Sequence, residues 1–108
     1  MNLQTKIINL ANTECERAAV LHGPTFNSLH EAFAVIQEEF EEAMDQTDIF
    51  DGHREYFWSN VKANKIPEAR GRLDAMYEFA CYAAAEWIQV AAMCHKAMMT
   101  RQKEGGDA

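Results

Sequence analysis

The sequence predicts an all-α fold, and three observations support this prediction. Apolar residues recur every three or four positions along most of the chain, which is the period of an amphipathic helix. Only two prolines and five glycines interrupt the 108 residues, and they fall where helices are expected to end. No stretch alternates between apolar and polar residues as a half-buried strand would. We therefore expect an antiparallel bundle of about four helices.

The length and composition fit one small domain. Hydrophobic residues make up 48% of the chain and charged residues 25%, as in globular rather than disordered proteins. A chain of this size is able to bury a core of its own. We expect a single domain over residues 1–102 and a flexible tail over residues 103–108.

The first helix is expected from about Leu3 to Leu21, where apolar residues follow the helical spacing. Gly23 and Pro24 end it, because glycine accepts the conformation of a C-terminal cap and proline cannot continue a helix. The second helix is expected to begin after Ser28, which can form a capping box with Glu31.

The second helix fades around Asp45 to Asp48, and a third, shorter helix is expected over roughly Gly52 to Ala63. Pro67 fits the first turn of a final helix, which extends to about Arg101. Between Ala80 and Cys94 this helix is apolar nearly all round, and three short helices cannot cover such a surface. We therefore expect a homo-oligomer, at least a dimer, with the long helices packed across its interface.

The formal net charge is −7, from 17 acidic and 10 basic residues. A basic surface for nucleic acid or for an anionic membrane is therefore not expected. No long uninterrupted apolar stretch predicts a membrane span. The N-terminus lacks the apolar core of a signal peptide, and the three widely spaced cysteines are typical of reduced thiols. These features predict a cytoplasmic protein.

Glu86 is the residue that most constrains the function. It lies with Gln89 as the only polar pair in a long apolar run, and a carboxylate is rarely buried without a partner. On the second helix, Glu39 and Glu42 flank the apolar stripe and are the expected inward pair, with Glu38 in support. Carboxylates gathered from two helices repel one another unless a cation lies between them. Oxygen ligands of this kind suit Mg²⁺ or Mn²⁺.

Two other interpretations of these residues remain open. The run from Glu38 to Glu42 is typical of a solvated helix face when it stands alone. Glu86 alone can instead pair with a basic side chain, such as Arg70 or Lys96, of a neighbouring subunit. The joint occurrence of polar pairs on two helices is what favours the metal site.

The pattern EExxE on one helix, followed by ExxD on a later helix, is the signature of the MazG-like all-α nucleoside triphosphate pyrophosphohydrolases. This chain resembles that family. Glu38-Glu39-x-x-Glu42 matches the first half in full, and Glu86-Trp87-Ile88-Gln89 matches the second half in its glutamate. The strings HGPTFNSLHEAFAVIQEEFEEAMD and EWIQVAAMCHKAM are similar to a branch common in phages and prophages. The resemblance covers roughly residues 21–96.

The resemblance implies an Mg²⁺-dependent enzyme that cleaves a nucleoside triphosphate between the α- and β-phosphates, giving a nucleoside monophosphate and pyrophosphate. Glu39, Glu42 and Glu86 would hold the metal, with Gln89 in the position of the family's aspartate. Glu38 would orient or deprotonate the attacking water, or serve as a further ligand of the metal. The neutral amide weakens metal binding relative to a carboxylate, and the long stretch between the two halves indicates an inserted helix.

Further residues are candidate substrate contacts. Lys6 and Arg17 lie on the first helix and are candidates for binding phosphate. Asn27 and His30 lie at the start of the second helix, where backbone N–H groups favour anions, although His30 is more typical of a surface position. Three aromatic residues either stack on a base or belong to the core, namely Phe57, Trp58 and Trp87.

Three functions therefore remain open on the sequence. The first is Mg²⁺-dependent hydrolysis of nucleoside triphosphates. The second is that of a catalytically degenerate MazG-like phage or prophage protein, acting in nucleotide binding or protein interaction. The third is that of a helical dimerisation module whose glutamates are solvated. Pyrophosphate release in the presence of Mg²⁺ separates the first from the other two.

Overall fold

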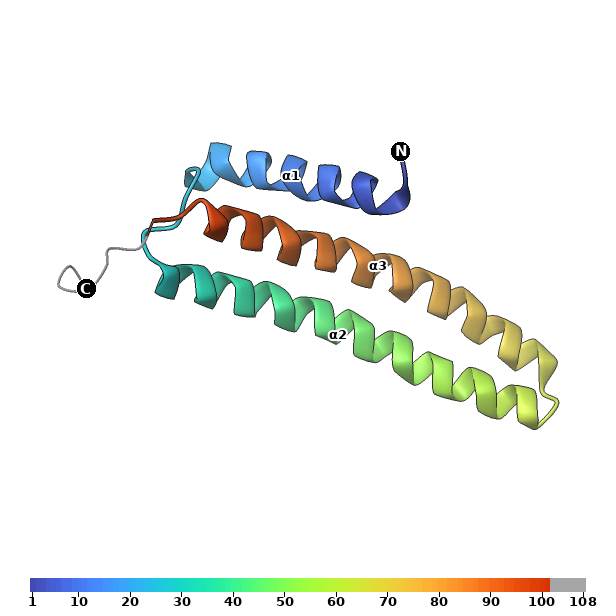
Figure 1. The fold of residues 1–108 in the computed structure, drawn as a ribbon. Helices are drawn as coiled ribbons and strands as arrows, with labels where there is room; N and C mark the ends of the chain where they lie inside the picture. The colour runs from blue at the N-terminus through green and yellow to red at the C-terminus, as the bar shows by residue number, and fades with distance from the viewer. Residues whose placement is uncertain (102–108) are drawn as a thin grey trace. The chain divides into compact units, whose positions relative to one another are not determined.

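The computed structural model describes residues 1–101 and confirms the all-α prediction. Its described part contains three helices, α1 (Leu3–His22), α2 (Leu29–Lys62) and α3 (Ile66–Met98), and no strand (Figure 1). None of these helices combines the length and apolar character needed to cross a membrane. The tail predicted at residues 103–108 lies outside the described residues.

The limits of α1 are set by its caps. The side chain of Asn2 accepts a hydrogen bond from the backbone N–H of Thr5 at 2.8 Å, which satisfies a donor of the first turn. At the other end Gly23 has a φ of 87°, and its N–H donates to the carbonyl oxygen of Ala19 at 2.9 Å. Glycine adopts this conformation readily because it lacks a Cβ. The predicted end of the first helix is therefore confirmed.

The start of α2 shows the serine half of the predicted capping box, while Glu31 pairs with Asn27. Ser28 Oγ accepts a hydrogen bond from the N–H of Glu31 at 3.1 Å. The Glu31 carboxylate reaches back to Asn27, accepting from its backbone N–H at 3.4 Å and from its side-chain amide at 3.0 Å. Asn27 is thus a member of this cap.

The predicted break between a second and a third helix is wrong, because α2 is one uninterrupted helix. A glycine inside a helix costs only about 1 kcal/mol relative to alanine, so Gly52 does not stop it. In the turns before Gly52, Thr47 Oγ1 donates to the carbonyl oxygen of Ala43 at 2.8 Å. Beside it, Arg54 Nε donates to Asp51 at 2.7 Å. The additional residues between the two acidic segments lengthen α2 and α3 and do not form an inserted helix.

A tight turn at residues 63–65 joins α2 to α3. Asn64 has a φ of 57°, and the N–H of Lys65 donates to the carbonyl oxygen of Asn60 at 2.8 Å. This bond and the left-handed residue end α2 as a Schellman cap. Pro67 then lies in the first turn of α3, as predicted, where its missing N–H has no helical partner to lose.

The chain divides into two compact units. Unit 1 contains Met1–Phe40 and the chain from Trp87 onward, and unit 2 contains Glu41–Glu86. Helices α2 and α3 each contribute one part to unit 1 and one part to unit 2.

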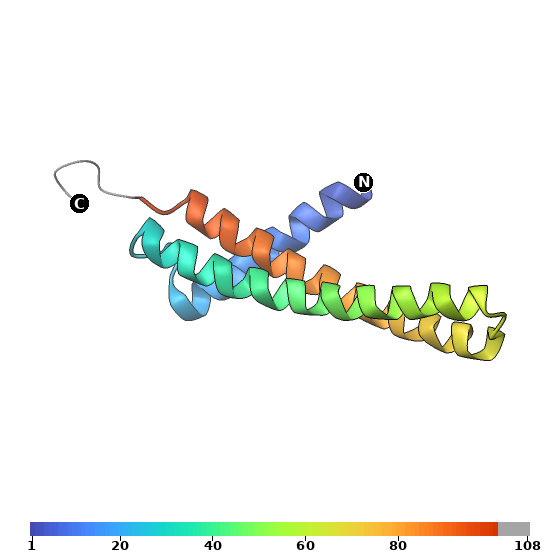
Figure 2. The same cartoon turned by 90° about the horizontal axis from the view of Figure 1, so that it is seen from below.

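Unit 1 is built from α1, the first part of α2 and the last part of α3, and Figure 2 shows α1 crossing α3 at an angle. Its buried cluster consists of Cys15, Phe26, Ala32, Ala92 and Met93. The Thr100 hydroxyl accepts a hydrogen bond from the N–H of Phe26 at 2.9 Å and donates to the carbonyl oxygen of Lys96 at 3.0 Å. These bonds join the α1–α2 loop to the end of α3 and hold Phe26 against the core.

Unit 2 is a hairpin of two antiparallel helical segments, residues 41–62 and 66–86 (Figure 1). Its buried side chains are all alanines, namely Ala43, Ala69 and Ala83. Larger apolar side chains of this unit are half-buried or exposed; Phe57 and Phe79 are half-buried, whereas Trp58 and Tyr77 are exposed. In the part of the chain that the structure describes, no large side chain is fully buried. Two helices alone cannot cover their apolar faces.

Candidate metal centre

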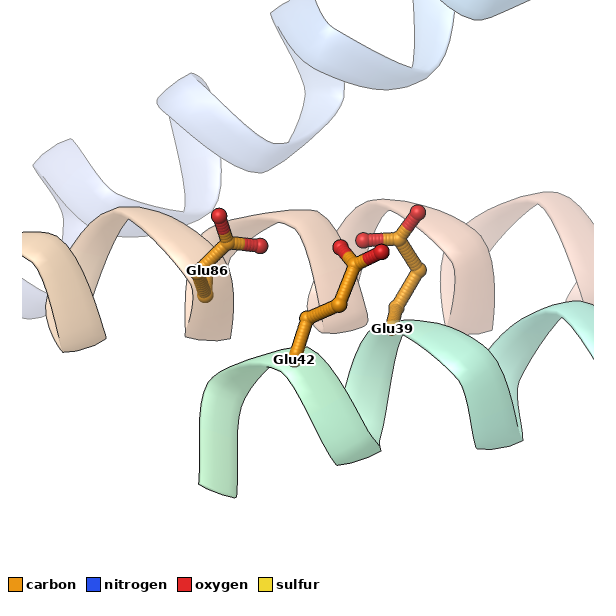
Figure 3. A group of neighbouring side chains, drawn as sticks. All are labelled: Glu39, Glu42 and Glu86. Carbon is orange, nitrogen blue, oxygen red and sulfur yellow. The ribbon is translucent and has the colours of Figure 1, made fainter. Parts of the chain in front are cut away.

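The structure brings together three glutamates of α2 and α3, which we call the acidic group. Glu42 and Glu86 both belong to unit 2, and Glu39 precedes Glu42 by one turn of the continuous helix α2. One carboxylate oxygen of each residue lies within 4.8 Å of the other two. Figure 3 shows their carboxyl groups turned toward a common space, with Glu39 and Glu42 on one helix and Glu86 on the other.

The spacing of these oxygens fits a divalent cation after small side-chain movements. Oxygen ligands lie about 2.1 Å from Mg²⁺, so two ligands on opposite sides of the ion are about 4.2 Å apart. Three ligands of one ion cannot all lie opposite one another, and adjacent ligands are only about 3 Å apart. Oxygens up to 4.8 Å apart therefore have to move inward, which rotation about the glutamate side-chain bonds allows. Mg²⁺ also keeps several water ligands, so three carboxylates need not complete its shell.

The carboxylates of the acidic group repel one another. Two like charges about 4 Å apart repel by about 1 kcal/mol in water and by about 4 kcal/mol near a protein surface. Glu39 and Glu86 are half-buried, so water screens them less than it screens the exposed Glu42. A divalent cation would turn this repulsion into attraction, which gives the acidic group the character of a metal site.

An ion pair within the chain does not provide that compensation for Glu86. Among the residues that the structure describes, no basic side chain lies within 4.0 Å of its carboxylate. Arg70 and Lys96 of the same chain are therefore not its partners. Pairing with these residues of a neighbouring subunit stays a prediction.

An aromatic contact in unit 1 fixes α2 against α3 beside the acidic group. Phe40 and Trp87 each follow a glutamate of the group in the sequence, and their rings pack edge to face with centroids 5.8 Å apart. Such a pair contributes about 0.5–1.5 kcal/mol beyond its buried area. Trp87 thus packs against α2 but is 40% exposed and lies outside the buried cluster; base stacking by Trp87 stays a prediction. The other two aromatic candidates, Phe57 and Trp58, belong to unit 2.

Gln89 lies one turn after Glu86 on α3. Its side-chain nitrogen donates to Glu14 Oε2 on α1 at 3.0 Å in a partly buried contact. Arg17 Nη1 donates to the same carboxylate, at 2.9 Å from Oε1 and 3.0 Å from Oε2. An amide that donates from its nitrogen keeps its oxygen as an acceptor, so the Gln89 oxygen is the atom that could bind a cation.

Glu14 is a residue of this site that the sequence reasoning missed. It lies at helical spacing from Ala11 and Ala18, and Cys15 follows it directly, so it borders the buried face of α1. An acidic residue beside a buried face is the same signal that singled out Glu86. On α1 this sequence signal is weak, because only Ala11 and Cys15 of that helix are buried and the buried face is therefore short.

The pH dependence of the Glu14 contact follows from its charge. The hydrogen bond from Gln89, followed by that from Arg17, holds the pKa of Glu14 below its ordinary value of 4.5. A carboxyl group whose pKa is lower in the folded protein contributes stability above its unfolded pKa, and this is lost as pH falls through the folded pKa. We expect Glu14→Gln to melt below the wild-type protein near neutral pH, with a difference that shrinks as the pH falls below 4.5. Thermal melting across that range measures it, and a constant difference would contradict the assignment.

The remaining predicted contacts are placed as follows. Lys6 and His30 are exposed. Arg17 is engaged in the ion pair on α1, and Asn27 in the cap of α2. Glu38 is exposed and directly precedes the acidic group on α2. The roles assigned to these residues stay predictions.

Comparison with known proteins finds no family model, no curated protein and no solved structure that matches this chain. The geometry of the acidic group is therefore the structural observation from which a function can be proposed.

Proposed function

We propose that this protein is a MazG-like nucleoside triphosphate pyrophosphohydrolase that depends on Mg²⁺ or Mn²⁺. The observation that carries the proposal is the convergence of Glu39, Glu42 and Glu86 from two helices, with oxygens within 4.8 Å of one another. This is the arrangement that the motif resemblance implies for a metal that holds a triphosphate. The net charge of −7 supports it, because an acidic protein needs a cation to bring phosphates to its carboxylates.

In this proposal the chain's own residues have distinct roles. The acidic group binds the metal, and Gln89 offers its side-chain oxygen as a neutral further ligand. When bound, Mg²⁺ neutralises charge on the triphosphate and on the departing pyrophosphate. Glu38 takes a proton from the water whose oxygen bonds to the α-phosphorus. The bond from that phosphorus to the oxygen bridging to the β-phosphate breaks, which gives a nucleoside monophosphate and pyrophosphate.

One observation favours a second candidate, in which the fold is kept and the catalysis is lost. The Gln89 amide is hydrogen-bonded to Glu14, so this position supports the contact between α1 and α3 where the resembled family has an aspartate. Such a protein would bind nucleotide without hydrolysing it, or act in protein interaction, as a degenerate phage or prophage member would.

The first candidate is tested by measuring pyrophosphate release from a panel of ribo- and deoxyribonucleoside triphosphates with Mg²⁺, Mn²⁺ or a chelator. We expect release that requires the metal and is matched by an equal amount of monophosphate, because the anhydride between the α- and β-phosphates is cleaved. Release of orthophosphate alone would contradict this cleavage site. A melting temperature that rises with metal, without any product, would favour the second candidate. A protein that does not respond to metal at all would support the third function, a helical dimerisation module.

We also propose that the protein is a homo-oligomer, at least a dimer. Within unit 2, α3 carries a row of exposed apolar side chains, which we call the α3 row: Ile66, Leu73, Tyr77, Ala80 and Ala84. Their spacings of three, four and seven residues place them on one side of the helix. A two-helix unit that buries only alanines needs further surface to pack against. A second copy offers the same row across a twofold axis.

A further inference from the structure

Lys96 is a charged side chain buried in unit 1, near the C-terminal end of α3. It is 4% exposed, and its ammonium lies 4.4 Å from the centre of the Phe26 ring. Among the residues that the structure describes, no carboxylate lies within 4.0 Å of this ammonium. Lysine is rarely buried to this extent without a charged partner. A ring face offsets only part of the cost of burying a charge, so the three donors of Lys96 have capacity for a further acceptor.

Lys96 lines a cavity of about 420 Å³ that lies within unit 1. Apolar side chains form much of its wall, including Phe26, Val35 and Met93. Phe26 and Met93 also belong to the buried cluster, so their packing holds this part of the wall in place. Glu39 lines the cavity as well and is a member of the acidic group. A ligand in the cavity would therefore adjoin one of the proposed metal ligands.

The charges around the cavity disfavour a polyphosphate and favour a neutral ring. Two carboxylates, Glu31 and Glu39, line it together with the single ammonium of Lys96 and the imidazole of His22, which is neutral at pH 7 in the formal charge count. A triphosphate in the cavity would meet more like charge than opposite charge. A flat heteroaromatic ring instead places its faces against the apolar wall. Its polar edge meets one strong donor in Lys96 and acceptor oxygens in the carboxylates.

We propose that this cavity holds the base of a nucleotide, and that the Lys96 ammonium donates a hydrogen bond to a carbonyl oxygen of the base. This rests on the nucleotide function proposed above and adds a preference among bases. Uracil, thymine, cytosine and guanine each carry a carbonyl oxygen, whereas adenine carries none. At the edge position where uracil and guanine carry a carbonyl oxygen, adenine carries an amino group, which is a donor. Lys96 therefore selects against adenine, because there its ammonium would face a donor and lose its hydrogen bond.

Binding of nucleosides tests this preference without any turnover. Uridine and adenosine are titrated separately into the full-length protein, in the presence of a chelator, and isotopically labelled methionine methyl groups are followed by NMR. We expect uridine to shift the Met93 signal and to bind roughly 10- to 100-fold more tightly than adenosine, the range for a hydrogen bond to a charged group. Met76 lies in unit 2 and serves as the internal control.

Two matched variants assign the preference to Lys96. Lys96→Met keeps an unbranched apolar side chain and removes the ammonium, and Lys65→Met makes the same exchange at an exposed position in the α2–α3 turn. We expect the first to lose the preference for uridine and the second to keep it. Equal affinities for the two nucleosides in the wild-type protein, no shift of Met93, or an unchanged preference in folded Lys96→Met would each overturn the proposal. The wild-type comparison does not depend on the folding of either variant.

The result is separable from that for the enzyme activity. If the pyrophosphohydrolase proposal fails and this one holds, no triphosphate is cleaved, yet uridine shifts Met93 and Lys96→Met removes the preference. If this proposal fails and the enzyme is real, Lys96→Met cleaves the triphosphates in the same order of preference as the wild-type protein.

Discussion

Glu86→Gln is expected to lower metal-dependent pyrophosphate release by at least about 100-fold, and Glu42→Gln by a similar factor. Each substitution keeps the size of the side chain and replaces a charged metal ligand with a neutral one. The two residues come from different helices of unit 2. Similar losses in both would therefore indicate a shared ion. The metal concentration that gives half the maximal rate should rise in both variants, and titrations of the rate with Mg²⁺ and Mn²⁺ measure it.

The same substitution tests the repulsion within the acidic group. In the presence of a chelator, Glu86→Gln should melt at a higher temperature than the wild-type protein, because one of three like charges within 4.8 Å is removed. With Mg²⁺ or Mn²⁺ the order should reverse, since the wild-type protein gains more stabilisation from a ligand that it binds more tightly. A loss of packing alone would lower the melting temperature in both conditions.

Glu41→Gln is the matched control for these measurements. Glu41 lies on the same turn of α2, next to Glu42, but outside the acidic group. It should keep the wild-type rate and the wild-type response to metal. Equal losses in Glu41→Gln and Glu42→Gln would contradict a localised metal site, as would a lower melting temperature for Glu86→Gln in the chelator.

Helical geometry explains why much of the acidic group could be predicted. Residues one turn apart on a helix share a side of it, so Glu39 and Glu42 lie together whatever they pack against. Their meeting with Glu86 depends on the hairpin. Glu42 and Glu86 are equally distant in sequence from Asn64, which lies in the turn. In an antiparallel helical pair, positions equally far from the turn lie side by side, and residues added equally to both arms preserve that pairing.

The expected break in α2 prevented the prediction that Glu42 and Glu86 lie equally far from the turn. The acidic stretch before Gly52 resembles a helix end, because aspartate and glycine are weak helix formers. Each aspartate or glycine costs a helix at most about 1 kcal/mol relative to alanine. Packing against a second helix outweighs this cost. With a short inserted helix, the residue of α3 opposite Glu42 could not be predicted. With α2 continuous up to the turn, the residue opposite Glu42 is Glu86.

Contacts between distant segments could not be predicted from spacing. The hydrogen bond between Glu14 and Gln89 joins residues 75 positions apart, and nothing local to either residue selects the other. Lys96 lies in the same apolar helix as Glu86, and its position in the sequence indicates only a partner for that carboxylate in another subunit. Its burial over Phe26 depends on the path of the α1–α2 loop, which the Thr100 hydroxyl holds. Helical periodicity carries no information about such a loop.

Tyr77→Glu is expected to weaken self-association by at least about 30-fold, the effect of losing a strong interface contact. Tyr77 is 76% exposed in a single chain and lies in the middle of the α3 row. A carboxylate at this position would be buried without a partner when two copies pack along the row. A twofold interface carries the substitution twice, which adds repulsion between the two carboxylates. Sedimentation velocity over a range of protein concentrations measures the change.

Ala63→Glu provides the control, because it introduces the same charge at an exposed position of the α2–α3 turn, outside the α3 row. It should sediment as the wild-type protein does. Unit 2 buries only alanines, so its stability should depend on the partner copy. The melting temperature should therefore rise with protein concentration in the wild type and in Ala63→Glu, and be lower and independent of concentration in Tyr77→Glu. Wild-type protein that sediments as a monomer, or Tyr77→Glu that associates like the wild type, would contradict an interface along the α3 row.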